Sequence, residues 1–210
     1  GRLVAARLTR LGVKVLVIDS SAEACAAARE EGLSVIETDA LSPAKLVDAG
    51  IFSTRYALGI TPNEHVNYLF ARRIAHDLRG PSLAVALERD HRGVTAEMVE
   101  RDDIEVLFAG ETDLHTWLAR ARHGDLRVES WQLGGGGRAV GFDQGPLDVL
   151  LPIALTRGSE VLPVVRRTEL RTNDTVAIAV HVARADEAAS WLESHGWTRV
   201  DGASARAKTV

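Results

Sequence analysis

The sequence predicts an α/β protein in which a parallel sheet is followed by a smaller α+β domain. Up to about residue 124, runs of β-branched apolar residues alternate with segments that have apolar residues at helical spacing. Beyond that point a glycine-rich segment leads into short β runs and one final helix. Strands that alternate with helices through short loops favour a parallel sheet with helices on both faces.

The elements of the first domain follow one another without long loops. Gly1 leads directly into a helical pattern, and Ser20 with Glu23 forms a capping box that predicts the start of the next helix. The expected order after the first helix is strand 13–19, helix 20–32, strand 33–37, a helix ending at 50, strand 55–60, helix 65–78, strand 81–88, helix 93–102 and strand 104–110. We expect the first strand of this sheet to be missing from the chain, with a strand and one more glycine upstream of Gly1 in a larger polypeptide.

The second part of the chain has a different pattern. Residues 125–133 read as a strand, and the glycine-rich stretch that follows has no apolar period. Three short β runs and a helix over 185–196 then complete an α+β domain, and residues 203–210 read as a frayed tail. The expected organisation is therefore a first domain over 1–124, a strand and glycine-rich linker over 125–145, and a second domain over 146–210.

Composition limits the function classes. The chain has 210 residues, 46% of them hydrophobic, and a formal net charge of −4, which gives no electrostatic support for binding nucleic acid. No apolar run reaches the length of about 18 residues that a membrane-spanning helix needs. The single cysteine, Cys25, has no partner for an internal disulfide, which fits a reducing compartment.

The best candidate binding signal is the pair of Gly1 and Asp19. Gly1 suits the second glycine of a GxGxxG loop, where backbone N–H groups approach a pyrophosphate at a helix N-terminus. Asp19 ends the following strand 18 positions later, where an acid accepts hydrogen bonds from a ribose diol and repels a 2′-phosphate. The spacing predicts a Rossmann-like site for NAD(H) or an adenine nucleotide; alternatively, Asp19 starts a turn. Val4 departs from the pattern, because it stands where the third glycine permits close packing.

Further polar residues follow the other strands. Asp39 suits either an adenine contact or a helix N-terminal turn, and Thr61 with Asn63 suits either a cleft or simple helix capping. Asn67 is a polar residue among apolar neighbours, which suits either a hydrogen bond to a loop near the ligand or solvent exposure.

No catalytic constellation is recognisable, and we expect the chain not to be an enzyme. The seven histidines have no metal-binding spacing, and no GxSxG elbow occurs. The second domain offers only Glu160, Glu169, Asp174 and His181 as acid or base candidates, each expected at the surface. The glycine quartet at 134–137 is expected to be a linker, since no Lys-Ser or Lys-Thr follows it.

Three segments carry a family resemblance. GRLVAARLTRLGVKVLVIDSS, GLSVIETDALSPAKLVDAGI and ALGITPNEHVNYLFARRI, in this order, resemble an RCK domain, also called a TrkA-type NAD-binding domain, of bacterial potassium channels and transporters. The most specific parts are Asp19, the TDA step with its downstream DAGI, and the TPNEHVN segment. The resemblance covers residues 1–110, and residues 152–180 are similar to the TrkA-C module that often follows.

The resemblance implies a regulatory, cofactor-binding role for particular residues. It implies that Gly1 contacts the phosphates, Asp19 the ribose and Asp39 the adenine region, with Thr61 and Asn67 lining the cleft. Their neighbours in the matching motifs complete the implied cofactor-binding set: Arg2, Leu3, Ser20, Thr38 and Ala40.

The resemblance also implies partners and a location. A domain of this family binds NAD(H) or an adenine nucleotide such as ATP or ADP, forms a homodimer or a higher oligomer, and gates a membrane-embedded cation channel, transporter or antiporter. The implied location is cytoplasmic, peripheral to the inner membrane through that partner. Two other functions stay open: a nicotinamide-dependent oxidoreductase, and a degenerate lobe that binds no nucleotide and serves as a dimerisation scaffold.

Overall fold

The computed structural model describes residues 1–78, 80–89, 93–135 and 141–200, and the chain divides into two compact units, Gly1–Val106 and Leu107–Val210. Within the described residues, no helix is long and apolar enough to cross a membrane. Of the expected linker, residues 136–140 lie outside the described part, as does the expected frayed tail.

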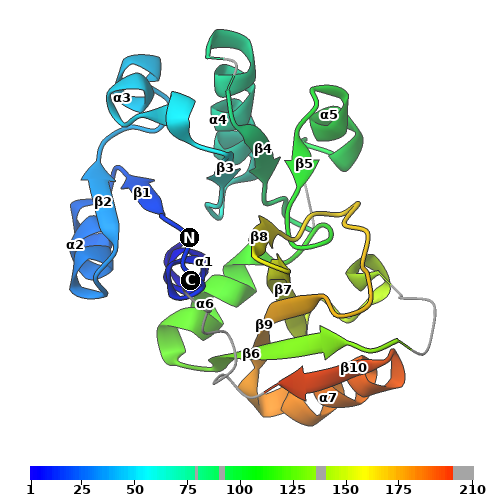
Figure 1. Ribbon diagram of the computed structural model, residues 1–210. Helices are drawn as coiled ribbons and strands as arrows, with labels where there is room; N and C mark the ends of the chain where they lie inside the picture. The colour runs from blue at the N-terminus through cyan, green and yellow to red at the C-terminus, as the bar shows by residue number, and fades with distance from the viewer. Residues whose placement is uncertain (79, 90–92, 136–140, 201–210) are drawn as a thin grey trace. The chain divides into compact units, whose positions relative to one another are not determined.

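The first unit alternates helices with parallel strands, as the sequence predicts. Its elements are α1 (Arg2–Arg10), β1 (Leu16–Asp19), α2 (Ala22–Glu30), β2 (Ser34–Glu37), α3 (Pro43–Asp48), the 3-10 helix η1 (Ile51–Ser53), β3 (Tyr56–Gly59), α4 (Glu64–Asp77), β4 (Ser82–Val85), α5 (Ala96–Arg101) and β5 (Glu105–Val106) (Figure 1).

The strands of the first unit form two sheets, although one continuous sheet was expected. β1 pairs in parallel with β2, and β3, β4 and β5 form a separate parallel sheet in that order. Among the described residues, no strand lies between β1 and β3 to pair with both of them. A parallel strand needs a neighbour about 4.8 Å away to satisfy its backbone groups, so an uninterrupted sheet requires a strand in that position.

Helices cover both faces of the paired strands β1 and β2. Val17 and Val35 pack with Ala5 of α1 and Ala28 of α2 in one small apolar cluster. Ile18, whose side chain alternates to the other face, packs against the larger cluster built from α3, α4, α5 and the second sheet. The period-two alternation of strand side chains therefore separates two groups of helices.

Side-chain caps fix the first residues of α2 and α4, and the cap of α2 lies one residue later than the sequence predicts. Ser21, and not Ser20, is the N-cap of α2, and its hydroxyl accepts a hydrogen bond from the Ala24 amide at 3.2 Å. Asn63 caps α4 by accepting from the amides of His65 and Val66. Asp19 accounts for the shift, because its carboxylate accepts from the Ser21 amide and forms a tight turn before the helix.

The last strand of the first unit is shorter than the expected 104–110. β5 ends at Val106, and the backbone then turns at Phe108 and Ala109, whose φ angles are 62° and 67°. The Phe108 amide donates to the carbonyl of Val164 at 2.8 Å, so this segment is part of the second unit. The apolar run LFAG reads as strand in the sequence because burial and strand formation produce the same pattern.

The second unit is an antiparallel sheet with helices, described in the order α6 (Leu114–His123), β6 (Leu126–Leu133), the 3-10 helix η2 (Phe142–Gln144), β7 (Leu150–Arg157), β8 (Glu160–Pro163), β9 (Thr175–His181), the 3-10 helix η3 (Val182–Arg184), α7 (Ala185–Ser194) and β10 (Trp197–Val200). The strand order is β10-β6-β9-β7-β8. The three β runs expected after residue 146 correspond to β7, β8 and β9, whereas β10 was not expected.

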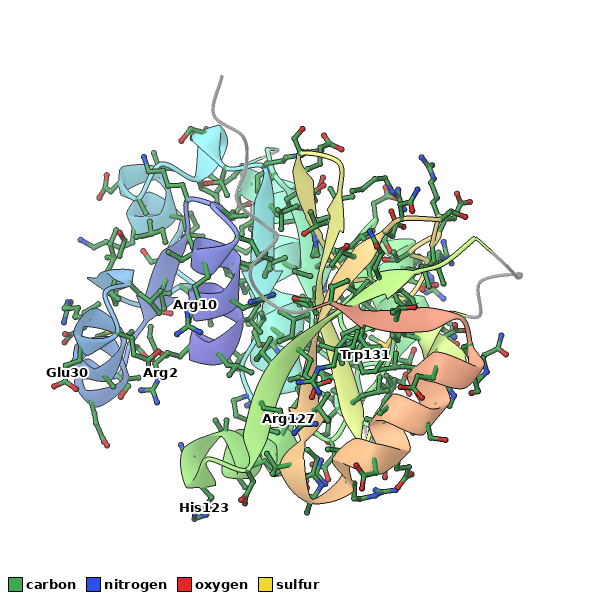
Figure 2. The ribbon with its side chains drawn as sticks, turned by 60° about the horizontal axis from the view of Figure 1, so that its bottom comes forward. Arg2, Arg10, Glu30, His123, Arg127 and Trp131 are labelled. Atoms are coloured by element: carbon green, nitrogen blue, oxygen red, sulfur yellow. The ribbon has the colours of Figure 1, made fainter. Side chains whose placement is uncertain are left out.

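The unit boundary differs from the expected boundaries at 124 and 145. α6 is part of the second unit because the Trp117 indole donates to the Leu147 carbonyl at 3.0 Å. β6, which was expected in a linker, pairs with both β9 and β10 and contributes Trp131 to the core. Figure 2 shows Arg127 and Trp131 along β6. The antiparallel pairing of β6 with β9 and β10 decides where the second unit begins, and a local sequence pattern does not reveal such long-range pairing.

Candidate functional site

Asp19 ends β1 with a carboxylate that is only partly used. One oxygen, Oδ1, accepts from the Ser21 amide at 2.9 Å, and the Asp19 backbone carbonyl accepts from the Thr38 amide at 2.9 Å. Among the described residues Asp19 forms no ion pair, and its second oxygen accepts no hydrogen bond. Asp19 is therefore held in place by its neighbours while it keeps capacity to accept hydrogen bonds from a ligand. Ser20 beside it is exposed.

Asp39 has a similar arrangement after β2. Its Oδ1 accepts from the Leu41 amide at 2.8 Å, and the side chain is exposed. Thr38, which links back to Asp19, lies directly before it, and Ala40 directly after it. The ends of β1 and β2 thus bring together Asp19, Ser20, Thr38, Asp39 and Ala40.

Gly1 is the N-cap of α1, a helix that has no side-chain cap and no acidic residue in its first turn. The amides at such a helix start have no intrahelical partner and favour an anion. A Cβ built on Gly1 would lie 3.6 Å from the Ile60 carbonyl, which puts the start of α1 at the end of β3.

Arg2 is directed elsewhere. Its guanidinium forms an ion pair with Glu31, which follows α2, at 2.9 Å. Figure 2 shows Arg2 and Arg10 on α1 and Glu30 on α2. Leu3 is half-buried, and Val4, which stands at the third glycine position of the expected fingerprint, is buried within α1.

Thr61 and Asn67 lie at the exit of β3 and are joined by hydrogen bonds. The Asn67 amide oxygen accepts from the Thr61 backbone amide and from its hydroxyl, both at 2.8 Å. Asn67 is 1% exposed, so of the two environments that the sequence allows, the structure has the one in which it bonds to a loop.

From the sequence, Cys25 bears only on disulfide formation and the redox compartment, but in the structure its side chain contacts the backbone of Asp19. Its thiol is fully buried and donates to the Asp19 backbone carbonyl, with 3.4 Å between Sγ and O. Burial raises the pKa of this thiol, and the carboxylates of Asp19 and Glu37 add to the shift. Its position in the first turn of a helix that follows Asp19 is the sequence signal that indicates this contact.

One of the acid candidates of the second unit, Asp174, has a structural role. Asp174 is buried and accepts from both Nε and Nη2 of Arg157, at 2.9 and 2.7 Å, and from the Arg171 amide at 2.7 Å. It was expected at the surface, and the buried ion pair explains the difference. Glu129, which the sequence did not single out, is also buried and accepts from the Trp131 indole at 2.9 Å. Glu160 and Glu169 are exposed and His181 is half-buried. The described residues include no group of three or more His, Cys, Asp or Glu side chains that could hold a metal ion.

Residues 1–108 match the TrkA-N domain family. Three solved structures are also similar to the chain. A GsuK channel bound to NAD is 14% identical with a TM-score of 0.42, over 85% of this chain and 35% of that one. A second GsuK channel is 12% identical with a TM-score of 0.42, over 95% and 38%. The GsuK RCK domain is 12% identical with a TM-score of 0.32, over 86% and 47%. The chain therefore spans less than half the length of each. No curated protein matches the chain significantly.

Proposed function

Because the chain belongs to the TrkA-N domain family, we propose that it is a regulatory domain that binds NAD(H) or an adenine nucleotide and gates a cation channel, transporter or antiporter. The partner in this proposal is a membrane-embedded domain for potassium or another cation. The domain itself would be cytoplasmic and would assemble as a homodimer or a higher oligomer.

The single observation that carries the proposal is the state of Asp19. Its carboxylate is fixed at the end of a parallel strand by the Ser21 amide and has no ion pair among the described residues, while α1 begins at Gly1 without a side-chain cap. A nucleotide presents a ribose diol and a phosphate chain, which are the two groups that an acid and a helix N-terminus bind. The negative charge of Asp19 favours NAD(H) over NADP(H), because it repels a 2′-phosphate.

Regulation requires that the ligand distinguish two arrangements of the assembly. A nucleotide shifts a conformational equilibrium only by the ratio of its affinities for the two states. A site formed by separate strand ends suits this role, since the ligand can favour the arrangement in which those ends lie closest together.

The experiment is a calorimetric titration of the protein with NADH, ATP and ADP. We expect at least one of them to bind, and we expect Asp19→Ala to raise its Kd about tenfold or more, because a charge-assisted hydrogen bond is lost. Glu30→Ala is the matched control: it makes the same change in charge at an exposed acid at the other end of α2. Equal effects of the two substitutions would contradict the assignment of Asp19.

Cys25 provides an independent measurement, since it is the chain's single cysteine and lies against Asp19. Modification by Ellman's reagent requires opening of the fully buried site. Bound nucleotide should slow this reaction in the unaltered protein and have little effect in Asp19→Ala. Absence of binding by all three nucleotides would favour the dimerisation scaffold, and turnover of NADH would favour an oxidoreductase.

A further inference from the structure

Asn67 lies on α4 with its whole hydrogen-bonding capacity in use. Its Nδ2 donates to the backbone carbonyls of Thr61 and Ala86, both at 2.9 Å. Its Oδ1 accepts from the amide and the hydroxyl of Thr61 at 2.8 Å. An amide group offers two donor hydrogens and one acceptor oxygen, so no group remains for a ligand.

The Thr61 side chain is exposed, but its hydroxyl takes part in the same contacts. Its one proton is accepted by either Asn67 Oδ1 at 2.8 Å or the Asn63 carbonyl at 3.0 Å, and its oxygen accepts from the Asn63 amide at 3.2 Å, which leaves one lone pair. The backbone amide of Thr61 is bound to Asn67 as well. The loop after β3 is therefore fastened to the first turns of α4.

The approach of α4 to β3 is close enough to favour glycine at position 59. A Cβ added to Gly59 would lie 3.1–3.2 Å from atoms of Asn67, which is tighter than ordinary van der Waals contact. The Gly59 carbonyl in turn accepts from the Ala86 amide at 2.9 Å. Asn67 thus joins the ends of two neighbouring strands, β3 and β4, at one point.

The fastened loop adjoins the start of α1. Ile60, directly before Thr61, has its carbonyl against Gly1, where a nucleotide phosphate would bind. We propose that Asn67 is a positioning residue and not a nucleotide ligand: through its hydrogen bonds to Thr61 it fixes the wall beside Gly1 and so determines nucleotide affinity without contacting the nucleotide. This inference rests on the proposed function above and assigns Asn67 a role different from the one that the family resemblance implies.

The test compares Asn67→Leu, which removes all four hydrogen bonds at similar volume, with Ile74→Ala. Ile74 is fully buried on the same helix, about two turns further along, so its truncation destabilises the same core away from the β3 loop. Both variants are made in the full chain. We measure the Kd for NADH by calorimetry, and the hydrogen exchange of the Thr61 amide relative to that of Val85 in β4 by NMR.

We expect Asn67→Leu to raise the Kd about tenfold and to accelerate the relative exchange of the Thr61 amide by a similar factor, because several hydrogen bonds are lost. Ile74→Ala should change the Kd less than about twofold and leave the relative exchange unaltered. Equal changes in Kd for the two variants, or an unaltered Thr61 exchange in Asn67→Leu, would overturn the inference.

Two further outcomes are distinguishable. If Asn67→Leu does not fold, Asn67→Asp takes its place: it keeps the volume and the accepted bonds but puts an oxygen opposite the carbonyls of Thr61 and Ala86, and the same results are expected. If the unaltered protein binds neither NADH, ATP nor ADP, the proposed function and the effect on affinity both fail, while the exchange of the Thr61 amide still decides whether Asn67 fastens the loop.

Discussion

Two acids of the first unit, Asp19 and Asp39, and two acids of the second unit, Asp174 and Glu129, are in opposite states. In the first unit, Asp19 and Asp39 each accept one backbone hydrogen bond within two residues and form no ion pair within the described residues. In the second unit, Asp174 and Glu129 are buried and matched by arginines: Asp174 by Arg157, and Glu129 by Arg127 and by Arg199, the last at 3.5 Å.

This difference separates a binding role from a stabilising one. A carboxylate that is fixed by a backbone amide but has no cation can accept a ligand without first losing a partner. A buried carboxylate with an arginine keeps the chain folded, because removing either member leaves an uncompensated charge.

The chain also carries separate probes of the two units: all four tryptophans lie after residue 107, and the single cysteine lies in the first unit.

The largest expected effect comes from breaking the Arg157 and Asp174 pair. Asp174→Ala should lower the free energy of unfolding of the second unit by about 3 kcal/mol, because it leaves a partly buried guanidinium without its partner. Urea unfolding followed by tryptophan fluorescence measures it. Glu193→Ala, at an exposed acid near the end of α7, makes the same change in charge and should cost less than about 0.5 kcal/mol. Equal losses would remove the contrast between the two kinds of acid.

The same pair predicts how stability depends on pH. Burial by itself raises the pKa of Asp174, but hydrogen bonds from Arg157 and the Arg171 amide lower it below its ordinary value. Since the pKa is lower in the folded state, this contribution to stability is complete above the unfolded value of about 3.9. It is lost as the pH falls through the lower, folded value. Tryptophan-detected unfolding from pH 7 down to pH 2 should be less pH-dependent in Asp174→Asn, and an unchanged dependence would exclude this pair as its source.

A smaller effect tests the backbone that begins the second unit. Ala109→Gly should be nearly neutral: it relieves a positive φ that costs alanine about 1–2 kcal/mol. It also loses a buried methyl group, worth about 0.8 kcal/mol, and adds about 0.5–1 kcal/mol of backbone entropy cost. Ala188→Gly, in the buried face of α7, relieves no positive φ and should lower the free energy of unfolding by about 2 kcal/mol. The difference between the two free energies of unfolding is the measurement, and equal costs would contradict strain at Ala109.

The smallest expected effect concerns Arg2. Its ion pair with Glu31 joins side chains that are 46% and 44% exposed, so Arg2→Ala should cost at most about 0.5 kcal/mol. The Kd for NADH should change less than about twofold, as in the control Arg10→Ala on the same helix. A tenfold rise in Kd limited to Arg2→Ala would instead make Arg2 part of the cofactor-binding set, as the family resemblance implies.

The sequence by itself determined the alternation of helices and strands in the first unit. The β-branched run that ends at Asp19, the cap at Asn63 and the helical spacing of residues 65–78 depend on local chemistry, and the structure has them within a few residues. The membership of the TrkA-N family follows from that same local pattern. Asp19 was predictable as a candidate because its position depends only on the end of one strand.

Only the tertiary structure decided which of these residues meet. The burial of Asn67 against Ala86 at the end of β4 and the place of β6 in an antiparallel sheet join residues distant along the chain. The pairing of Arg157 with Asp174 and of Arg2 with Glu31 was equally absent from the sequence pattern. Propensity and periodicity describe the neighbours of a residue along the chain, whereas hydrogen bonds and ion pairs depend on distances of about 3 Å that folding alone creates.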